Sequence, residues 1–251
     1  MQRTPTGDPR KMANRTWQDD PAHGLCITSP EGSFDAYQAR PAEKAGPVVV
    51  VLHEVFGVNA DLRATCGELA LAGFIAICPE LFWRQELHVD LSVRSQEDWE
   101  KGLSLYRGYD IDAGVRDIEA TVAAARAIEG SSPRVGVMGF CLGGLLTFVA
   151  AARTRVDAAV AFHGARTGEF LDETADIDGP LQMHLAEDDE FMPKEEQQGI
   201  TAALASDPRF EVFSYAGCRH AFSRHGGNHF NANAARLARS RTLDFFNRHL
   251  A

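Results

Sequence analysis

Residues 134–150 contain a short apolar strand, a tight turn and an apolar helix in direct succession, and this arrangement restricts the fold more than any other feature of the chain. The turn, 139–143, reads Gly-Phe-Cys-Leu-Gly. This is the nucleophile-elbow pattern, in which glycines flank a central residue held in strained backbone geometry, because a Cβ at either glycine would collide with the neighbouring strand or helix. The pattern predicts that Cys141 projects above the carboxyl end of a sheet.

The position of Cys141 before a helix bears on its chemistry. The first turn of a helix offers free N–H groups and a partial positive charge, which favour a thiolate and any oxyanion formed beside it. The alternative is a buried structural cysteine beside packing glycines, since free cysteine is a common core residue. Only the surrounding residues can decide between the two.

Strand and helix signals alternate along the rest of the chain. Strands are predicted for 25–28, 34–39, 47–52, 74–78, 134–138, 158–162, 180–186 and 211–215, and helices for 59–72, 96–107, 111–128, 142–150, 194–205 and 231–250. The fully apolar run 47–52 is typical of a strand buried on both faces. The alternation predicts an α/β fold, a doubly wound and mostly parallel sheet with helices on both faces. We expect one domain over 21–251 and a flexible extension over 1–20, where no periodicity is found.

Charge and cysteine content narrow the class of protein. The chain has 251 residues and a formal net charge of -10, which argues against nucleic acid or an anionic membrane surface as a partner. Its five cysteines are odd in number and form no C-x-x-C pair, and no run resembles a signal peptide or membrane span. We expect a reducing compartment, the cytoplasm, which would keep a catalytic thiol reduced.

Polar residues follow four of the predicted strands. They are Glu54, Cys141, Asp189 and His220, and the last three stand in the order nucleophile, acid, histidine of α/β enzymes with a nucleophile elbow. Because sites in such sheets lie beyond the carboxyl ends of the strands, we expect these side chains to meet. His220 would then act as base for Cys141, and Asp189 would orient the imidazole, with Asp188 as its substitute.

Two further features complete the predicted site. The backbone N–H groups of Leu142 and Val55 are the expected oxyanion donors. Glu54 follows a wholly apolar strand, where a carboxylate is costly unless it is paired, hydrogen-bonded or neutral. A carboxyl group beside the thiol could hold the thiol proton at rest or, as the carboxylate, remove it during the reaction.

Simpler interpretations exist for these residues. Asp189 belongs to an acidic loop that is typical of solvated surface, and His220 is one of nine histidines. The trio His220, His225 and His229 suggests a metal site, but Gly226-Gly227 interrupts any common helix face and no carboxylate or cysteine spacing accompanies it. We therefore expect no metal, and the lack of a phosphate-binding glycine loop predicts no nucleotide cofactor.

These motifs together resemble the dienelactone hydrolase family (carboxymethylenebutenolidases) from about residue 25 to the C-terminus. The matching segments are 52–59 (LHEVFGVN), 78–82 (CPELF), 139–144 (GFCLGG), 184–193 around Asp189, and 215–222 (YAGCRHAF). The resemblance implies an α/β-hydrolase fold and a cysteine hydrolase that opens lactones or cleaves esters through an acyl-enzyme. It implies no cofactor.

The resemblance also implies roles for individual residues. Glu54 would contact the resting thiol and swing to deprotonate it when substrate binds, while Arg224 would engage Glu54 or a substrate carboxylate. The helix 96–107 would contribute Trp99, Leu103 and Tyr106 to the substrate pocket.

The chain departs from the family pattern at two places. A second basic clamp is missing, for which Arg84 or Arg107 is the candidate replacement, and Ala221 stands where the family has serine. These changes favour a substrate that is a somewhat more apolar lactone or ester than dienelactone. An anionic substrate stays compatible with the sequence. The oligomeric state stays open.

Three other functions compete with this one. A class I amidotransferase needs a downstream His-x-Glu pair, and none of the histidines has glutamate two positions later. The flavodoxin-like cysteine peptidases and glyoxalases often carry histidine directly after the cysteine, where this chain has Leu142. A non-catalytic protein that binds small acids would not require the set Cys141, Asp189 and His220.

Overall fold

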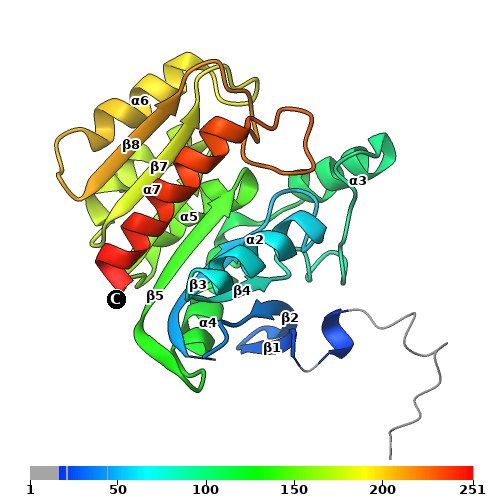
Figure 1. The fold of residues 1–251 in the computed structure, drawn as a ribbon. Helices are drawn as coiled ribbons and strands as arrows, with labels where there is room; N and C mark the ends of the chain where they lie inside the picture. The colour runs from blue at the N-terminus through cyan, green and yellow to red at the C-terminus, as the bar shows by residue number, and fades with distance from the viewer. Residues whose placement is uncertain (1–16, 21, 44, 251) are drawn as a thin grey trace, which may run out of the picture.

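The protein is built around one eight-stranded sheet (Figure 1). The computed structural model describes residues 17–20, 22–43 and 45–250. The strands are β1 (Gly24–Ser29), β2 (Gly32–Ala39), β3 (Gly46–Leu52), β4 (Ile75–Pro79), β5 (Ser131–Phe140), β6 (Ala158–Phe162), β7 (Leu181–Ala186) and β8 (Phe210–Tyr215). Their order in the sheet is β1-β2-β4-β3-β5-β6-β7-β8.

The sheet is parallel except at the β2 strand. β2 pairs antiparallel with both β1 and β4, whereas the six strands from β4 to β8 run parallel to their neighbours. The carboxyl ends of β3, β5, β6, β7 and β8 therefore meet at one edge. This edge is where the polar residues that follow the strands gather.

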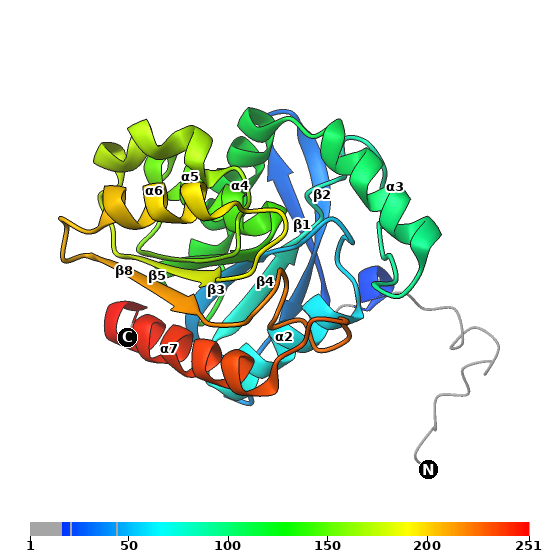
Figure 2. The same cartoon turned by 90° about the horizontal axis from the view of Figure 1, so that it is seen from above.

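Helices cover both faces of the sheet (Figure 2). The helices are α2 (Ala60–Leu71), α3 (Gln96–Arg107), α4 (Ile111–Arg126), α5 (Leu142–Arg153), α6 (Lys194–Leu204) and α7 (Ala232–Leu250). Figure 2 shows α2 and α7 on one side and α4, α5 and α6 on the other. Two 3-10 helices, η1 (Trp17–Asp19) and η2 (Thr167–Asp176), complete the fold.

The valines of β3 show how the sequence makes this three-layer arrangement. Val49 and Val51 pack with the α2 and α7 side chains, including Phe245, whereas Val48 and Val50 pack on the opposite face. All four valines are fully buried. A continuous apolar run is thus required because each face of the strand meets a helix layer.

The predicted α/β-hydrolase fold is confirmed, with element boundaries that differ by a few residues. The largest differences are the longer β5 strand and the unpredicted η2. Of the predicted N-terminal extension, residues 1–16 lie outside the described residues, while Trp17 packs edge-on against Tyr37 at a centroid distance of 5.8 Å. The domain boundary near residue 20 stays a prediction.

Candidate active site

The elbow at Cys141 is built from backbone contacts that only glycine allows. Cys141 has a φ of 54°, and its N–H donates to the Phe162 carbonyl at the end of β6. A Cβ on Gly143 would overlap the carbonyl oxygen of Leu52, and one on Gly144 would overlap that of Phe162. The elbow is therefore pressed against the ends of β3 and β6, with Cys141 partly exposed.

A buried pair formed by His220 and Asp189 lies beside the elbow. The loop after β8 carries His220, and the loop after β7 carries Asp189, whose carboxylate accepts from His220 Nδ1 at 2.8 and 3.0 Å. The backbone N–H groups of Phe191 and Met192 also donate to Asp189 Oδ1. With the side chain of Asp189 fully buried and that of His220 4% exposed, the pair is fixed in one orientation.

The charge on His220 depends on Cys141. Burial alone would lower the pKa of His220, but the negative charge of Cys141 and the hydrogen bond to Asp189 raise it to about 10. The second ring nitrogen, Nε2, is buried and has no hydrogen-bond partner among the described residues. When Cys141 is ionised, the arrangement places its negative charge beside a protonated His220.

Two backbone donors lie near the elbow without acceptors. Among the described residues, neither the N–H of Leu142 nor that of Val55 donates a hydrogen bond, and both residues are buried. Leu142 opens α5, so its N–H belongs to the free first turn. The two N–H groups are available to an oxyanion.

The carboxylate of Glu54 is held by Arg224. Arg224 Nε donates to Glu54 Oε2 at 2.6 Å, and Nη2 donates to Oε1 at 2.7 Å. The Glu54 side chain is 3% exposed and that of Arg224 13%, and the guanidinium lies 4.9 Å from the centre of the Phe56 ring. The expected contact between Glu54 and Cys141 is not among the hydrogen bonds of the described residues, because both oxygens face Arg224.

A cavity of about 320 Å³ opens beside His220 and Arg224. Of the three residues expected in the substrate pocket, Trp99 lines this cavity, whereas Leu103 and Tyr106 do not. The three residues lie on α3, but only the first turns of this helix face the cavity. Cys141 is not among the lining residues either, and its side chain reaches the site next to His220.

The basic residues near this cavity differ from those expected. Arg84 binds Asp117 at 2.7 Å and Glu31 at 2.8 Å and so is already engaged, and Arg107 does not line the cavity. Arg94 lines it instead, and among the described residues this guanidinium makes no ion pair. Because Arg94 lies in a loop before α3, no periodic pattern in the sequence indicates its direction.

The sequence analysis also missed the aromatic wall of the site. Phe191 packs edge-on against His220 at a centroid distance of 4.9 Å and lies 6.1 Å from Trp99. Its place two residues after Asp189 is the signal that could have indicated it. The wall makes the cavity both apolar and basic.

The other two histidines of the trio have separate partners. His229 Nδ1 hydrogen-bonds to the His220 carbonyl at 3.0 Å, whereas His225 lies 3.4 Å from Glu68. Within the described part of the chain, no three His, Cys, Asp or Glu side chains are grouped as metal ligands.

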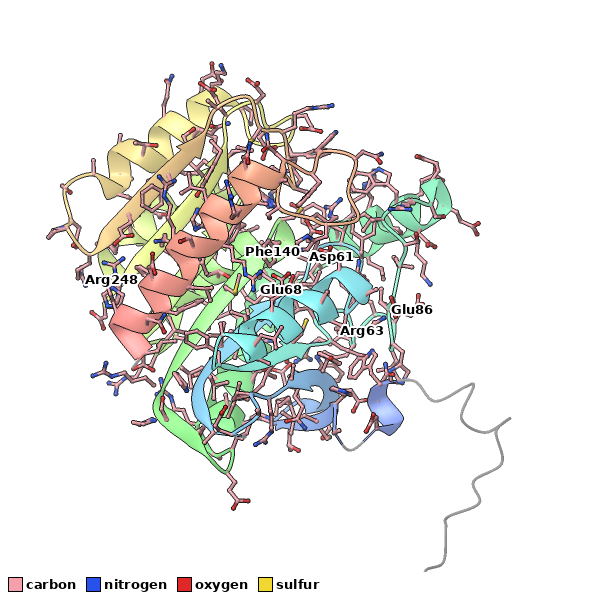
Figure 3. The ribbon with its side chains drawn as sticks, viewed as in Figure 1. Asp61, Arg63, Glu68, Glu86, Phe140 and Arg248 are labelled. Atoms are coloured by element: carbon pink, nitrogen blue, oxygen red, sulfur yellow. The ribbon has the colours of Figure 1, made fainter. Side chains whose placement is uncertain are left out.

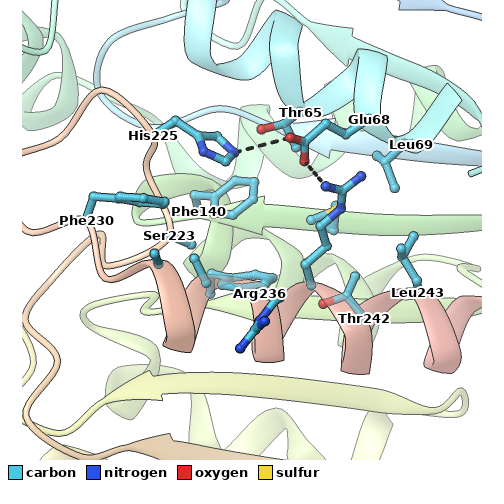
Figure 4. Close-up of a pocket in the computed structure, with 15 residues that line it drawn as sticks. Thr65, Glu68, Leu69, Phe140, Ser223, His225, Phe230, Arg236, Thr242 and Leu243 are labelled. Atoms are coloured by element: carbon cyan, nitrogen blue, oxygen red, sulfur yellow. Dashed lines mark ion pairs between the residues drawn. The ribbon is translucent and has the colours of Figure 1, made fainter. Parts of the chain in front are cut away.

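A second cavity lies between α2 and α7, on the other side of the loop that carries Arg224 (Figure 4). Glu68 binds both His225 and Arg239 at its wall, as the dashed lines show. Glu68 and Phe140, both labelled in Figure 3, line this cavity together. Ser223 and His225 face it, while Arg224 between them faces the first cavity.

None of the helices in the described part of the chain combines the length and apolar character needed to cross a bilayer.

Comparisons with known proteins agree with this fold. The model of the dienelactone hydrolase family matches residues 34–250. A protein of Azospirillum brasilense, provisionally named a carboxymethylenebutenolidase, is 40% identical over 88% of this chain and 95% of its own. The carboxymethylenebutenolidase of Pseudomonas putida is 36% identical over 88% of this chain and 94% of its own. A crystal structure from Klebsiella pneumoniae, provisionally described as a dienelactone hydrolase, superposes with a TM-score of 0.79 at 26% identity and covers 90% of this chain and 98% of its own. The chain belongs to the dienelactone hydrolase family and is a hydrolase of lactone or ester bonds.

Proposed function

We propose that Cys141 is the nucleophile with which this chain opens lactones or cleaves carboxylic esters, that His220 is its base, and that Asp189 orients His220. The observation that carries the proposal is the strained elbow that holds Cys141 beside the buried pair of His220 and Asp189. The raised pKa of His220, to which an ionised Cys141 and the Asp189 carboxylate both contribute, supports a protonated imidazole beside the nucleophile once the thiol is ionised.

The reaction proceeds through an acyl-enzyme. The Cys141 thiolate attacks the carbonyl carbon, and the N–H groups of Leu142 and Val55 stabilise the oxyanion. The bond between carbon and the ring or ester oxygen then breaks, and the leaving alkoxide takes the proton from His220. His220 next removes a proton from water, whose oxygen attacks the thioester and releases the acid and the thiolate.

Glu54 and Arg224 form the second functional unit of the proposal. A substrate carboxylate in the cavity competes with Glu54 for the Arg224 guanidinium, because both offer the same bidentate geometry. Once released, Glu54 turns toward Cys141 and removes the proton of a thiol that is not yet ionised. The position of Arg224 in the cavity wall supports this exchange.

The cavity favours an anionic substrate with an apolar body. Arg94 and Arg224 supply positive charge, and Phe56, Trp99 and Phe191 supply apolar contact. Arg94 thus fills the role for which Arg84 and Arg107 were expected. We further propose that residues 21–251 act as one domain in the cytoplasm, where a catalytic thiol stays reduced.

The decisive experiment measures hydrolysis of cis-dienelactone and of an activated aryl ester. The Cys141→Ala variant should lose turnover of both substrates. Cys26→Ala is the matched control, because Cys26 is an exposed cysteine of β1. Equal loss in both variants would contradict the assignment of Cys141, and a wild type that binds small acids without turnover would favour the non-catalytic alternative.

A second experiment addresses Arg94 and Glu54. Arg94→Ala should raise the KM for cis-dienelactone about 3- to 5-fold and leave that for a neutral aryl ester within two-fold, since one exposed ion pair with substrate is lost. Iodoacetamide should alkylate Cys141 faster when a substrate analogue with a carboxylate is bound. A fast alkylation rate that is the same with and without the analogue would contradict the proposed exchange between Glu54 and the substrate carboxylate at Arg224.

A further inference from the structure

His163 is a buried histidine in a strained position beside the active site. It follows β6 directly, its φ is 37°, and its exposed fraction is 0%. Its N–H donates to the carbonyl of His184 at 2.9 Å, and the next residue, Gly164, lies against the backbone of Gly144. The backbone thus fixes His163 between the elbow helix and β7.

Stability does not explain a histidine here. Neither ring nitrogen of His163 has a hydrogen-bond partner among the described residues. A neutral imidazole carries one donor and one acceptor, and buried polar atoms without partners are rare because their lost hydration is not replaced. By contrast, His184 on the neighbouring strand bonds through both nitrogens, to Tyr215, Gln182 and Thr242. An apolar ring at position 163 would avoid the loss of hydration.

Among the described residues, the polar ring in contact with His163 is that of His220. The centroids of the two imidazoles are 4.5 Å apart, and their planes cross at 61°. The other ring neighbours are Phe140, Phe162 and Phe222, at centroid distances of 6.1 to 6.3 Å. His220 contacts Phe191 as well, so two rings restrain it.

The surroundings keep His163 neutral. Burial, followed by the positive charges of His220 and Arg224, lowers the pKa of His163 well below its ordinary value. His220 is protonated over the same range of pH. The charged and titratable groups that face the two rings are Cys141 from the elbow, His184 from β7, Asp189 and Glu190 from the next loop, and Arg224 and His229 from the loop after β8.

We propose that His163 is a positioning residue for His220, whose neutral imidazole restrains the ring and stabilises its protonated form. An imidazole without fixed hydrogen bonds can place its acceptor nitrogen toward the imidazolium in either tautomer. The buried setting strengthens this attraction between a dipole and a charge, because no water screens it. The inference rests on the proposed role of His220 as base.

The test uses His163→Phe, which keeps the ring and removes both nitrogens. The rate of alkylation of Cys141 by iodoacetamide, measured against pH, reports on the pair of Cys141 and His220 without any substrate. The alkaline limb of this profile, the part at high pH, reports the loss of the proton from His220. Less stabilisation of the imidazolium should lower the pKa of this limb by about 1 unit, which corresponds to a 10-fold weaker preference for the protonated form. The value of kcat on the aryl ester should fall about 10-fold, with KM within two-fold.

Thermal unfolding separates this role from a structural one. The Tm of His163→Phe should stay within about 3 °C of the wild type, since relief of two unpaired nitrogens offsets the strain of a phenylalanine at positive φ. His163→Asn, which tolerates positive φ but is too short to reach His220, should show the same shift of the alkaline limb and keeps the test valid if the first variant fails to fold. Phe245→Leu, a buried change on α7, is the control and should leave the pH profile unchanged.

Three results would overturn the inference. The first is an alkaline limb of the alkylation profile whose pKa lies within 0.2 unit of the wild-type value in the folded variants. The second is a kcat of His163→Phe within two-fold of the wild type. The third is a Phe245→Leu variant that loses as much activity as His163→Phe when both lose the same amount of Tm. A wild type that hydrolyses neither lactones nor esters would contradict the proposed function instead, and the alkylation profile would still decide the role of His163.

Discussion

Removal of Arg224 should destabilise the protein strongly, because Glu54 would be left buried without a partner. Arg224→Met removes two bonds of 2.6 and 2.7 Å to a carboxylate that is 3% exposed. Charge-assisted hydrogen bonds contribute about 1.5–3 kcal/mol each, and removal of one partner of a buried pair costs about 3–5 kcal/mol. At about 2–4 °C per kcal/mol for a chain of this size, the Tm should fall by about 6–20 °C.

The opposite change, Glu54→Gln, should cost less. Arg224 lines the cavity, so its guanidinium keeps contact with water after Glu54 is neutralised. We expect a loss of about 1–3 kcal/mol. The double variant should lose much less stability than the two single variants lose together, because neither charge is then left without a partner.

The assay is urea unfolding at pH 7 for the wild type, both single variants and the double variant. The free energies of unfolding from the four proteins give the coupling energy directly. Two results would refute the reasoning from burial. One is a loss of unfolding free energy in Arg224→Met that is no larger than the loss in Glu54→Gln. The other is a loss in the double variant that equals the sum of the two single losses.

Three further predictions concern the triad and the elbow. Asp189→Asn should lower kcat/KM of ester hydrolysis by about 10³–10⁴ while circular dichroism stays unchanged, since the amide cannot hold the required tautomer of His220; a fall below 10-fold would argue against an orienting role. Because the pKa of His220 is raised from 6.5 to about 10, its stabilising contribution is complete below pH 6.5 and is lost as the pH rises to 10. Urea titrations should show this fall, and a Cys141→Ala variant with an equally steep fall would exclude the thiol as its main cause. Gly143→Ala should cost about 1–3 kcal/mol by overlap with the end of β3, whereas Gly67→Ala, where nothing lies within 4 Å, should gain about 0.5–1 kcal/mol in the same melts.

The sequence predicted the elements whose signals are local. Asn59 illustrates this, because its side chain accepts from the N–H of Leu62 and caps α2 where the cap residue indicated a start. The apolar runs indicated the buried parallel strands β3, β4, β6 and β7 for the same reason, since burial on both faces requires them. The η2 helix was missed because Thr167–Asp176 holds only three apolar side chains, Phe170, Leu171 and Ala175, which is too few to indicate a helix.

The strand-end rule also located the centre of the site. It brought Asp189 and His220 together beside Cys141, because parallel strands place their carboxyl ends at one edge. The rule fails where a side chain's direction depends on packing between distant elements. Leu103 and Tyr106 do not line the cavity, because only the start of α3, which carries Gln96 and Trp99, reaches it, and the placement of a helix against a cavity is not encoded locally.

The contacts around the elbow have a consequence for how the chain can vary. Gly143 and Gly144 rest on carbonyl oxygens at the ends of β3 and β6, and Cys141 directly follows β5, so its sulfur is located by main-chain atoms of three strands. Replacement of core side chains alters packing and stability but leaves those carbonyl oxygens in the sheet. Substitutions in the core therefore leave the position of the Cys141 sulfur unchanged. Only the few glycines that touch the backbone must be retained to keep the sulfur in place.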